Sequence, residues 1–311
     1  MTKNKWIKFG FKFLVSLFFV WWIVFKIDWV EVLLYFKKIS VWGIVLYISA
    51  YFLGMFFSVY KWRFLASFKG INLPLGEYFK AYFTGTFVNN FMPSFIGGDS
   101  YKIYRIGKLS DKYKEAASSV VMDRLTGFLG GMFLVFIFSV FNWNVILDNK
   151  ILLFLNLINI ILLLSSLVFI KFFTHKEIGT PIKKVNEIFN RLMREVNRYN
   201  GESKTIWKAI GLSFFFNLIG LALANYILFL SMGVSVGALD YLSVIFLISI
   251  VSSLPVSINN IGIKEWAYIT FFGFFGLSSA GVISVAILSR IIQMLLSFLA
   301  VPIYLKGKKN I

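Results

Sequence analysis

Residues 125–147 read LTGFLGGMFLVFIFSVFNWNVIL, an apolar stretch without a charged residue. A helix needs about 20 apolar residues to cross a bilayer core of about 30 Å. Residues 39–60, 151–170 and 209–239 are also uncharged and long enough, and residues 9–25 are nearly so. The chain is 59% hydrophobic and only 15% charged, against about half and about a quarter in soluble domains. We therefore expect a polytopic, all-α membrane protein.

The charges predict how the chain is oriented. Its 32 Lys and Arg residues against 14 Asp and Glu give a net charge of +18. The basic residues gather before residue 9, at 61–80, 99–115 and 171–208, and at the C-terminus, whereas 26–38, 142–150 and 232–240 carry few. The positive-inside rule then places both termini in the cytoplasm and the protein in the cell membrane. We interpret the charge as orientation and attraction to anionic lipids, and expect no nucleic-acid partner.

Two apolar stretches are interrupted. Residues 81–98 are uncharged, but a crossing there would export the basic segment that follows, so a re-entrant hairpin with Pro93 near its tip is expected. Residues 241–263 are broken by Pro255. Both prolines are expected hinges, because proline interrupts helical hydrogen bonding. The expected architecture is about six full spans plus two re-entrant broken hairpins. The alternative is that 241–305 forms three crossings, which leaves the C-terminus on the same side.

The two halves of the chain repeat one plan. In each half a broken apolar stretch is followed by an acidic residue and, 25 residues later, by an arginine: Asp99 with Arg124, and Glu265 with Arg290. The predicted topology gives the units 39–141 and 206–305 opposite orientations. Inverted repeats with interrupted helices are typical of transporters, whose substrate site lies at the repeat interface.

The remaining features complete the domain organisation. Residues 1–311 are expected to form a single transmembrane domain. The cytoplasmic segment 171–205 is basic and carries an apolar stripe, which predicts an interfacial helix on the anionic inner leaflet; the alternative is a solvated linker helix. The chain has no Cys and one His, His175, so no metal site, cofactor or Ser-His-Asp triad is expected.

Ionisable residues within the apolar stretches form the candidate site, because an unpaired charge costs at least ~2.5–3.5 kcal/mol at the bilayer centre. Arg124 and Arg290 are expected to hold a phosphate through their guanidinium forks. Asp99 and Glu265 would neutralise the empty site or carry a coupling proton. The alternative is that Asp99–Arg124 and Glu265–Arg290 are purely structural ion pairs.

Further candidates surround these charges. Gly97, Gly98 and Gly262 precede half-helix starts, whose free amides and positive dipole favour anions; alternatively, these glycines only permit tight turns. Lys102 and Arg105 share a helix face with the preceding acid. They either line a basic track that leads to the hairpin tip or snorkel to water.

These motifs resemble the lysylphosphatidylglycerol synthase transmembrane-region family of flippase-like membrane proteins. The resemblance rests on Asn89-Asn90-Phe91-Met92-Pro93 with Gly97-Gly98-Asp99, on Arg105 and Arg124, and on Leu254-Pro255-Val256-Ser257, Gly262-Ile263-Lys264-Glu265 and Arg290. It covers roughly residues 9–305. It implies a lipid flippase module, here without the soluble aminoacyltransferase domain that some members carry.

The expected function is translocation or binding of an anionic lipid between leaflets, either a phospholipid or a polyprenyl-phosphate-linked lipid. The headgroup would lie between the hairpin tips, and membrane lipids would be the partners. The alternative is a non-transporting scaffold or subunit for a separate lipid-modifying enzyme or glycosyltransferase. We do not expect an enzyme; an intramembrane enzyme using Asp99 and Glu265 ranks last. The sequence predicts no particular oligomeric state.

Overall fold

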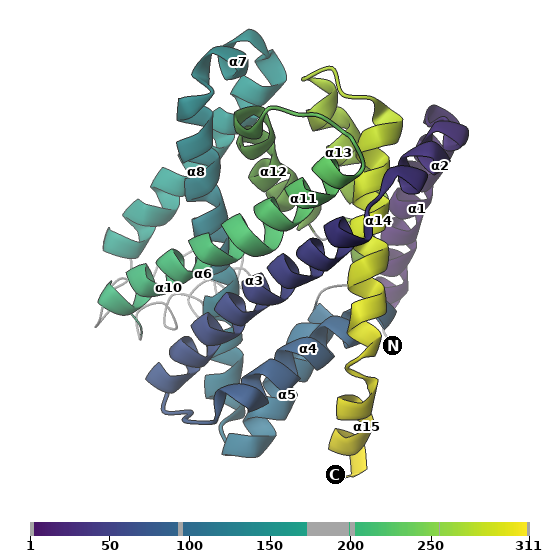
Figure 1. Cartoon of the computed structure of the whole chain (residues 1–311). Helices are drawn as coiled ribbons and strands as arrows, with labels where there is room; N and C mark the ends of the chain where they lie inside the picture. Colours follow the sequence, from purple (N-terminus) through teal and green to yellow (C-terminus); the bar gives the residue numbers. More distant parts are fainter. Residues whose placement is uncertain (1–2, 93–95, 173–198, 200–202, 255, 310–311) are drawn as a thin grey trace.

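The structure, a computed structural model, describes residues 3–92, 96–172, 199, 203–254 and 256–309. This part of the chain is helical throughout and contains no β-strand (Figure 1). Within the described residues, five helices are long and apolar enough to cross a membrane, or six if the bent first pair is one span. The predicted all-α membrane class is therefore confirmed.

The helices follow one another in the order labelled in Figure 1. They are α1 (Lys3–Lys26), α2 (Trp29–Lys38), α3 (Val41–Phe68), α4 (Leu75–Phe91), α5 (Ile96–Ser110), α6 (Tyr113–Phe141), α7 (Trp143–Asp148), α8 (Lys150–Phe172), α10 (Ser203–Phe215), the π-helix η1 (Phe216–Leu223), α11 (Ala224–Ser231), α12 (Ala238–Ser252), the 3₁₀ turn η2 (Ile258–Asn260), α13 (Ile263–Gly273), α14 (Ser279–Phe298) and α15 (Val301–Lys309).

The first span ends in a sharp bend that the sequence analysis missed. Residues 26–38 were expected as a plain connection, but they contain α2, which lies at 85° to α1. Asp28 starts α2, because its carboxylate accepts hydrogen bonds from the amides of Val30 and Glu31. Ser278 donates to the Glu31 carboxylate over 2.9 Å, which fixes α2 beside the start of α14.

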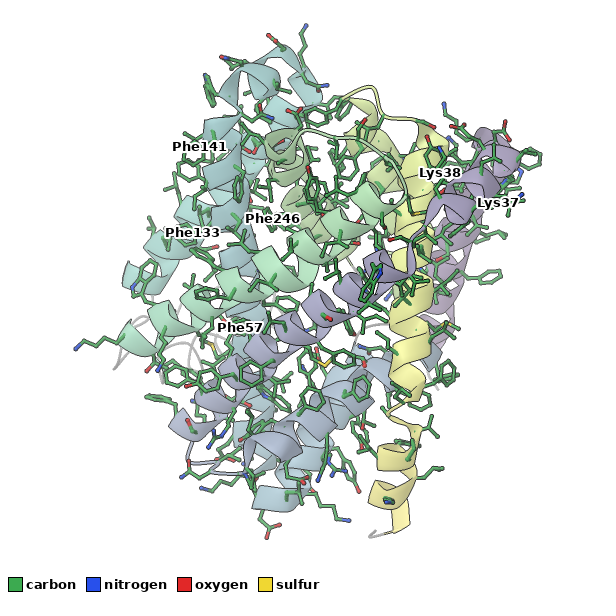
Figure 2. The ribbon with its side chains drawn as sticks, viewed as in Figure 1. Lys37, Lys38, Phe57, Phe133, Phe141 and Phe246 are labelled. Carbon is green, nitrogen blue, oxygen red and sulfur yellow. The ribbon has the colours of Figure 1, made fainter. Side chains whose placement is uncertain are left out.

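Two glycines mark the crossing of α3 and η1, one from each half of the chain. A Cβ atom at Gly54 would overlap the backbone of Gly220, and a Cβ at Gly220 would overlap the backbone of Gly54. Small residues permit this kind of close approach between membrane helices. The largest apolar core lies nearby and includes Phe246, whereas Phe141 points outward with 70% exposure, as a lipid-facing side chain does (Figure 2).

A buried ion pair ties α3 to α6 and α10. The ammonium of Lys61 lies 3.0 Å from the Asp123 carboxylate and 3.1 Å from the Ser213 hydroxyl. The two charged side chains are only 3% and 6% exposed. The uncharged stretch ends at residue 60 and predicts Lys61 in the basic flank, but α3 continues to Phe68. Lys61 ends the uncharged stretch in the sequence, although its ion pair with Asp123 keeps it buried inside the helix bundle.

Two pairs of short helices occupy the interrupted stretches. Helices α4 and α5 run antiparallel, because Gly85 lies against Gly98 while Glu77 pairs with Arg105 at 2.9 Å. Helices α12 and α13 pack together, with η2 between them. Re-entrant placement of these pairs stays a prediction, as does the inverted relationship of 39–141 and 206–305. Pro93 and Pro255 lie outside the described residues, as do His175 and nearly all of 171–205.

Single cysteines in this Cys-free chain test the topology. Lys108 and Asn144 are exposed and lie in α5 and α7, at opposite ends of the molecule (Figure 1). We expect a membrane-impermeant thiol reagent to label Asn144→Cys on intact cells and Lys108→Cys only after permeabilisation. The unsubstituted chain is the blank. Labelling of residue 108 from outside would remove the cytoplasmic hairpin.

Removing one member of the buried pair should destabilise the protein strongly. We expect Lys61→Met to lower the free energy of unfolding in detergent by about 3–5 kcal/mol, because it leaves the Asp123 carboxylate buried without its closest cation. Joint replacement, Lys61→Met with Asp123→Asn, should recover most of this loss. A single variant as stable as the parent would show that the pair does not hold α3 against α6.

Candidate functional site

Both predicted ion pairs are formed. The guanidinium of Arg124 donates from Nε and Nη2 to the two carboxylate oxygens of Asp99, over 2.9 and 3.1 Å. The Nε of Arg290 donates to Glu265 over 2.9 Å. In each case a long helix supplies the arginine and a short helix, α5 or α13, supplies the acid. The spacing of 25 residues therefore brings acid and base together twice.

The first pair belongs to a larger group, here named the first charge cluster: Lys61, Asp99, Lys102, Asp123 and Arg124. The Lys102 ammonium lies 3.1 Å from Asp99 and 3.8 Å from Asp123, so it bridges the two carboxylates. Lys61 and Arg124 take the outer sides of the same two acids. Three cations thus face two carboxylates, which leaves one positive charge in excess.

The second charge cluster consists of Lys264, Glu265 and Arg290. Arg290 also donates to the backbone carbonyls of Asn259 and Asn260, over 3.1 and 3.2 Å. Lys264 donates to the Ser289 hydroxyl over 3.1 Å, and no described carboxylate forms an ion pair with it. This cluster too carries one positive charge in excess, and it holds the η2 turn in place through the Arg290 guanidinium.

The predicted amide sites are already engaged. The amide of Gly98 donates to the side-chain oxygen of Asn89 over 2.7 Å, and that of Gly262 donates to Glu265 over 2.9 Å. Gly97 lies in the first turn of α5 against Met92. Gly262 has a φ of +87°, a conformation that favours glycine. In this conformation the amides of Gly98 and Gly262 donate to protein side chains. The turn interpretation therefore fits better than anion binding.

Lys102 and Arg105 do not form the expected basic track. The Lys102 side chain is 6% exposed and points into the first charge cluster, so it does not snorkel to water. Arg105 pairs with Glu77 of α4 and closes the hairpin at its other end. Lys102 pairs with Asp99 of its own helix face and with Asp123 of α6, and Arg105 pairs with Glu77 of α4.

One cavity lies at the meeting point of the two interrupted stretches, and we name it the hairpin cavity. Its volume is about 340 Å³. It is lined by asparagines from both stretches, by the two cations of the second charge cluster and by polar residues of α14: Asn89, Asn90, Asn259, Asn260, Lys264, Arg290, Gln293 and Ser297, together with Tyr51, Thr86, Ile261 and Met294. Residues of α4, η2, α13 and α14 thus share one polar space.

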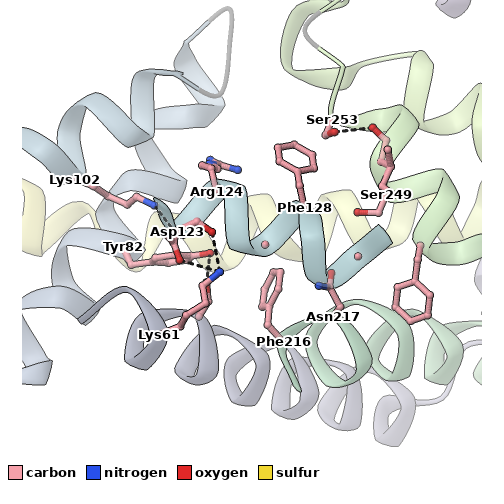
Figure 3. A pocket seen from close by; sticks show the side chains of 15 residues that line it. Lys61, Tyr82, Lys102, Asp123, Arg124, Phe128, Phe216, Asn217, Ser249 and Ser253 are labelled. Atoms are coloured by element: carbon pink, nitrogen blue, oxygen red, sulfur yellow. Dashed lines mark hydrogen bonds and ion pairs between the residues drawn. The ribbon is translucent and has the colours of Figure 1, made fainter. Parts of the chain in front are cut away.

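A second cavity, the α6 cavity, has a volume of about 160 Å³ and contains Arg124 (Figure 3). Lys61, Lys102 and Asp123 also line it, together with hydroxyl and aromatic groups of α4, η1 and α12. Arg124 and Arg290 therefore lie in different cavities. The prediction that both would hold one phosphate does not match this arrangement, since the two charge clusters are built on different helices.

Sequence reasoning missed part of both cavities. Lys61 was assigned to a flank, and the asparagines were noted only as motif residues. A usable signal existed, because Asn89-Asn90 and Asn259-Asn260 repeat a polar pair within an otherwise apolar stretch. Over the described ranges no three His, Cys, Asp or Glu side chains converge to hold a metal. The hydrogen-bond donors that line the cavities are ammonium, guanidinium, amide and hydroxyl groups. Such donors suit an anion with several acceptor oxygens.

The comparisons with known proteins agree with this architecture. The sequence matches the family model described as "Lysylphosphatidylglycerol synthase TM region" over residues 10–300. It is also similar to the UPF0104 membrane protein MJ1595 of Methanocaldococcus jannaschii, with 26% identity over 260 residues, or 76% of each chain. Because the family model spans nearly the whole length, the protein belongs to the lysylphosphatidylglycerol synthase transmembrane-region family.

Proposed function

We propose that this protein binds the phosphate of an anionic lipid in the hairpin cavity and moves the lipid between leaflets. The observation that carries the proposal is the excess positive charge of the second cluster beside a polar space of about 340 Å³. The acyl or prenyl chains would stay in the bilayer. Both a phospholipid and a polyprenyl-phosphate-linked lipid have the required headgroup.

Electrostatics favour an anionic occupant. Glu265 is the single carboxylate of the second charge cluster and pairs with Arg290, whereas Lys264 donates to the Ser289 hydroxyl. An unpaired charge inside the membrane costs at least ~2.5–3.5 kcal/mol. A lipid phosphate beside Lys264 would offset that cost, because it carries the missing negative charge. The four asparagine amides and Gln293 supply both donors and acceptors for the rest of a headgroup.

The same contacts suggest how binding would couple to movement. Arg290 holds Glu265 and the carbonyls of Asn259 and Asn260 at the same time. Glu265 in turn accepts from the Gly262 amide. A phosphate that drew the Arg290 guanidinium toward the cavity would compete with all of these bonds and loosen the turn before α13. A ligand shifts a conformational equilibrium only through such differential contacts.

A transport assay tests the proposal directly. The protein would be reconstituted into liposomes with a fluorescent phosphatidylglycerol, and the rate at which label reaches the opposite leaflet would be measured. We expect Lys264→Gln or Arg290→Gln to lower that rate by about tenfold or more, because a hydrogen bond to a charged group contributes ~1.5–3 kcal/mol. Lys80→Gln is the matched control, since Lys80 lies at the surface and pairs only with Glu77 among its described contacts.

The other outcomes separate the alternatives. A folded double variant of Lys264 and Arg290 that transports as fast as the parent would eliminate the hairpin cavity as the headgroup site. Parent protein that moves neither phosphatidylglycerol nor a polyprenyl phosphate would favour the scaffold interpretation. Chemical conversion of the supplied lipid, detected by mass spectrometry, would make the protein an enzyme.

A further inference from the structure

We propose that the α6 cavity is a second anion-binding site, separate from the hairpin cavity, and that it takes the phosphate group of a phosphoester with a net negative charge. Anion binding at this site requires no transport activity, so it can be tested independently of the proposed flippase function. Three features of the described residues support it: charge balance, free donor groups and the nature of the cavity wall.

Charge balance is the first feature. Lys61 and Lys102 have side-chain exposures of 3% and 6%, so bulk water solvates neither ammonium group. Asp99 serves Lys102 and Arg124, and Asp123 serves Lys61 and Lys102. No other described acid pairs with this cluster. One monoanion in the cavity would complete the balance that the protein itself leaves open.

Free donor groups are the second feature. Arg124 uses Nε and Nη2 for Asp99, and its Nη1 donates to no described protein group. The Tyr82 hydroxyl accepts from Ser58 over 3.1 Å and keeps its own proton available. Ser249 faces the same space from α12 (Figure 3). Donors therefore approach from α4, α6 and α12, as the several oxygens of a phosphate require.

The cavity wall is the third feature. A volume of about 160 Å³ is far above the ~10–15 Å³ that a single water needs. Phe128 and Phe216 line the cavity beyond the charges (Figure 3). Phe246 is a third aromatic residue in its wall. A hydrated halide would leave these aromatic residues unused, whereas a phosphoester places its oxygens on the cations and its carbon groups on the rings. The Arg124 side chain is 46% exposed, which leaves the site accessible.

The test measures the thermal unfolding midpoint of the full chain with and without a phosphoester. Glycerol 3-phosphate in detergent probes a soluble source, and nanodiscs of phosphatidylglycerol against phosphatidylcholine probe a lipid headgroup. Both arms use the Lys264→Gln background, which removes the excess cation of the hairpin cavity. We expect a rise in the midpoint with one of these phosphoesters, because a ligand of the native state stabilises it. Adding Lys102→Gln should abolish the rise by making the first cluster neutral, whereas adding Lys80→Gln should not.

A second variant covers the risk that Lys102→Gln fails to fold. Ser249→Leu fills the cavity without removing a charge, and it should weaken the apparent affinity by about tenfold or more through loss of a donor and of space. A response to glycerol 3-phosphate assigns a soluble occupant, and a response to phosphatidylglycerol alone assigns a lipid. The proposal is wrong if the Lys264→Gln protein responds to neither, or if Lys102→Gln and Ser249→Leu leave the response unchanged.

Discussion

The pairing of Lys61 with Asp123 is the interaction on which the rest of the structure depends. A charge within a bilayer must find a partner, because neither water nor lipid solvates it there. Here Lys61 and Asp123 are 62 residues apart along the chain. Their ion pair therefore fixes α3 against α6. Ser213 brings α10 to the same point. The short helix α5 is added when Lys102 joins Asp123 to Asp99.

The two charge clusters use similar chemistry for different structural ends. In the first, buried cations join long helices, and the arginine lies toward the outside of the group. In the second, Arg290 and Glu265 hold a turn together, and the side chains lie beside the larger cavity. A cluster that joins helices resists change, whereas one that holds a turn can release it. This difference is why we propose headgroup binding in the hairpin cavity and a separate anion site in the α6 cavity.

Much of the fold could be predicted from sequence, because membrane spans and broken stretches are local properties of composition. The pairing of Asp99 with Arg124 and of Glu265 with Arg290 also followed from a repeated spacing. The division into two cavities did not, because it depends on which helices cross. The prediction for Lys61 was wrong for the same reason, because its hydrogen-bond partner Ser213 lies 152 residues further along the chain. The amides of Gly98 and Gly262 were expected to be free, but Asn89 and Glu265 occupy them.

The contact of Gly54 with Gly220 has a mechanical consequence. The backbones of α3 and η1 touch there with no side chain between them, so rotation about the contact requires little repacking, while sliding along it would drive a bulky neighbour into the opposing main chain. The π-helical turns of η1 place the crossing in a segment whose hydrogen bonding is already irregular. The two halves of the chain therefore have a fulcrum, and any tilting of one against the other would turn about this pair of glycines.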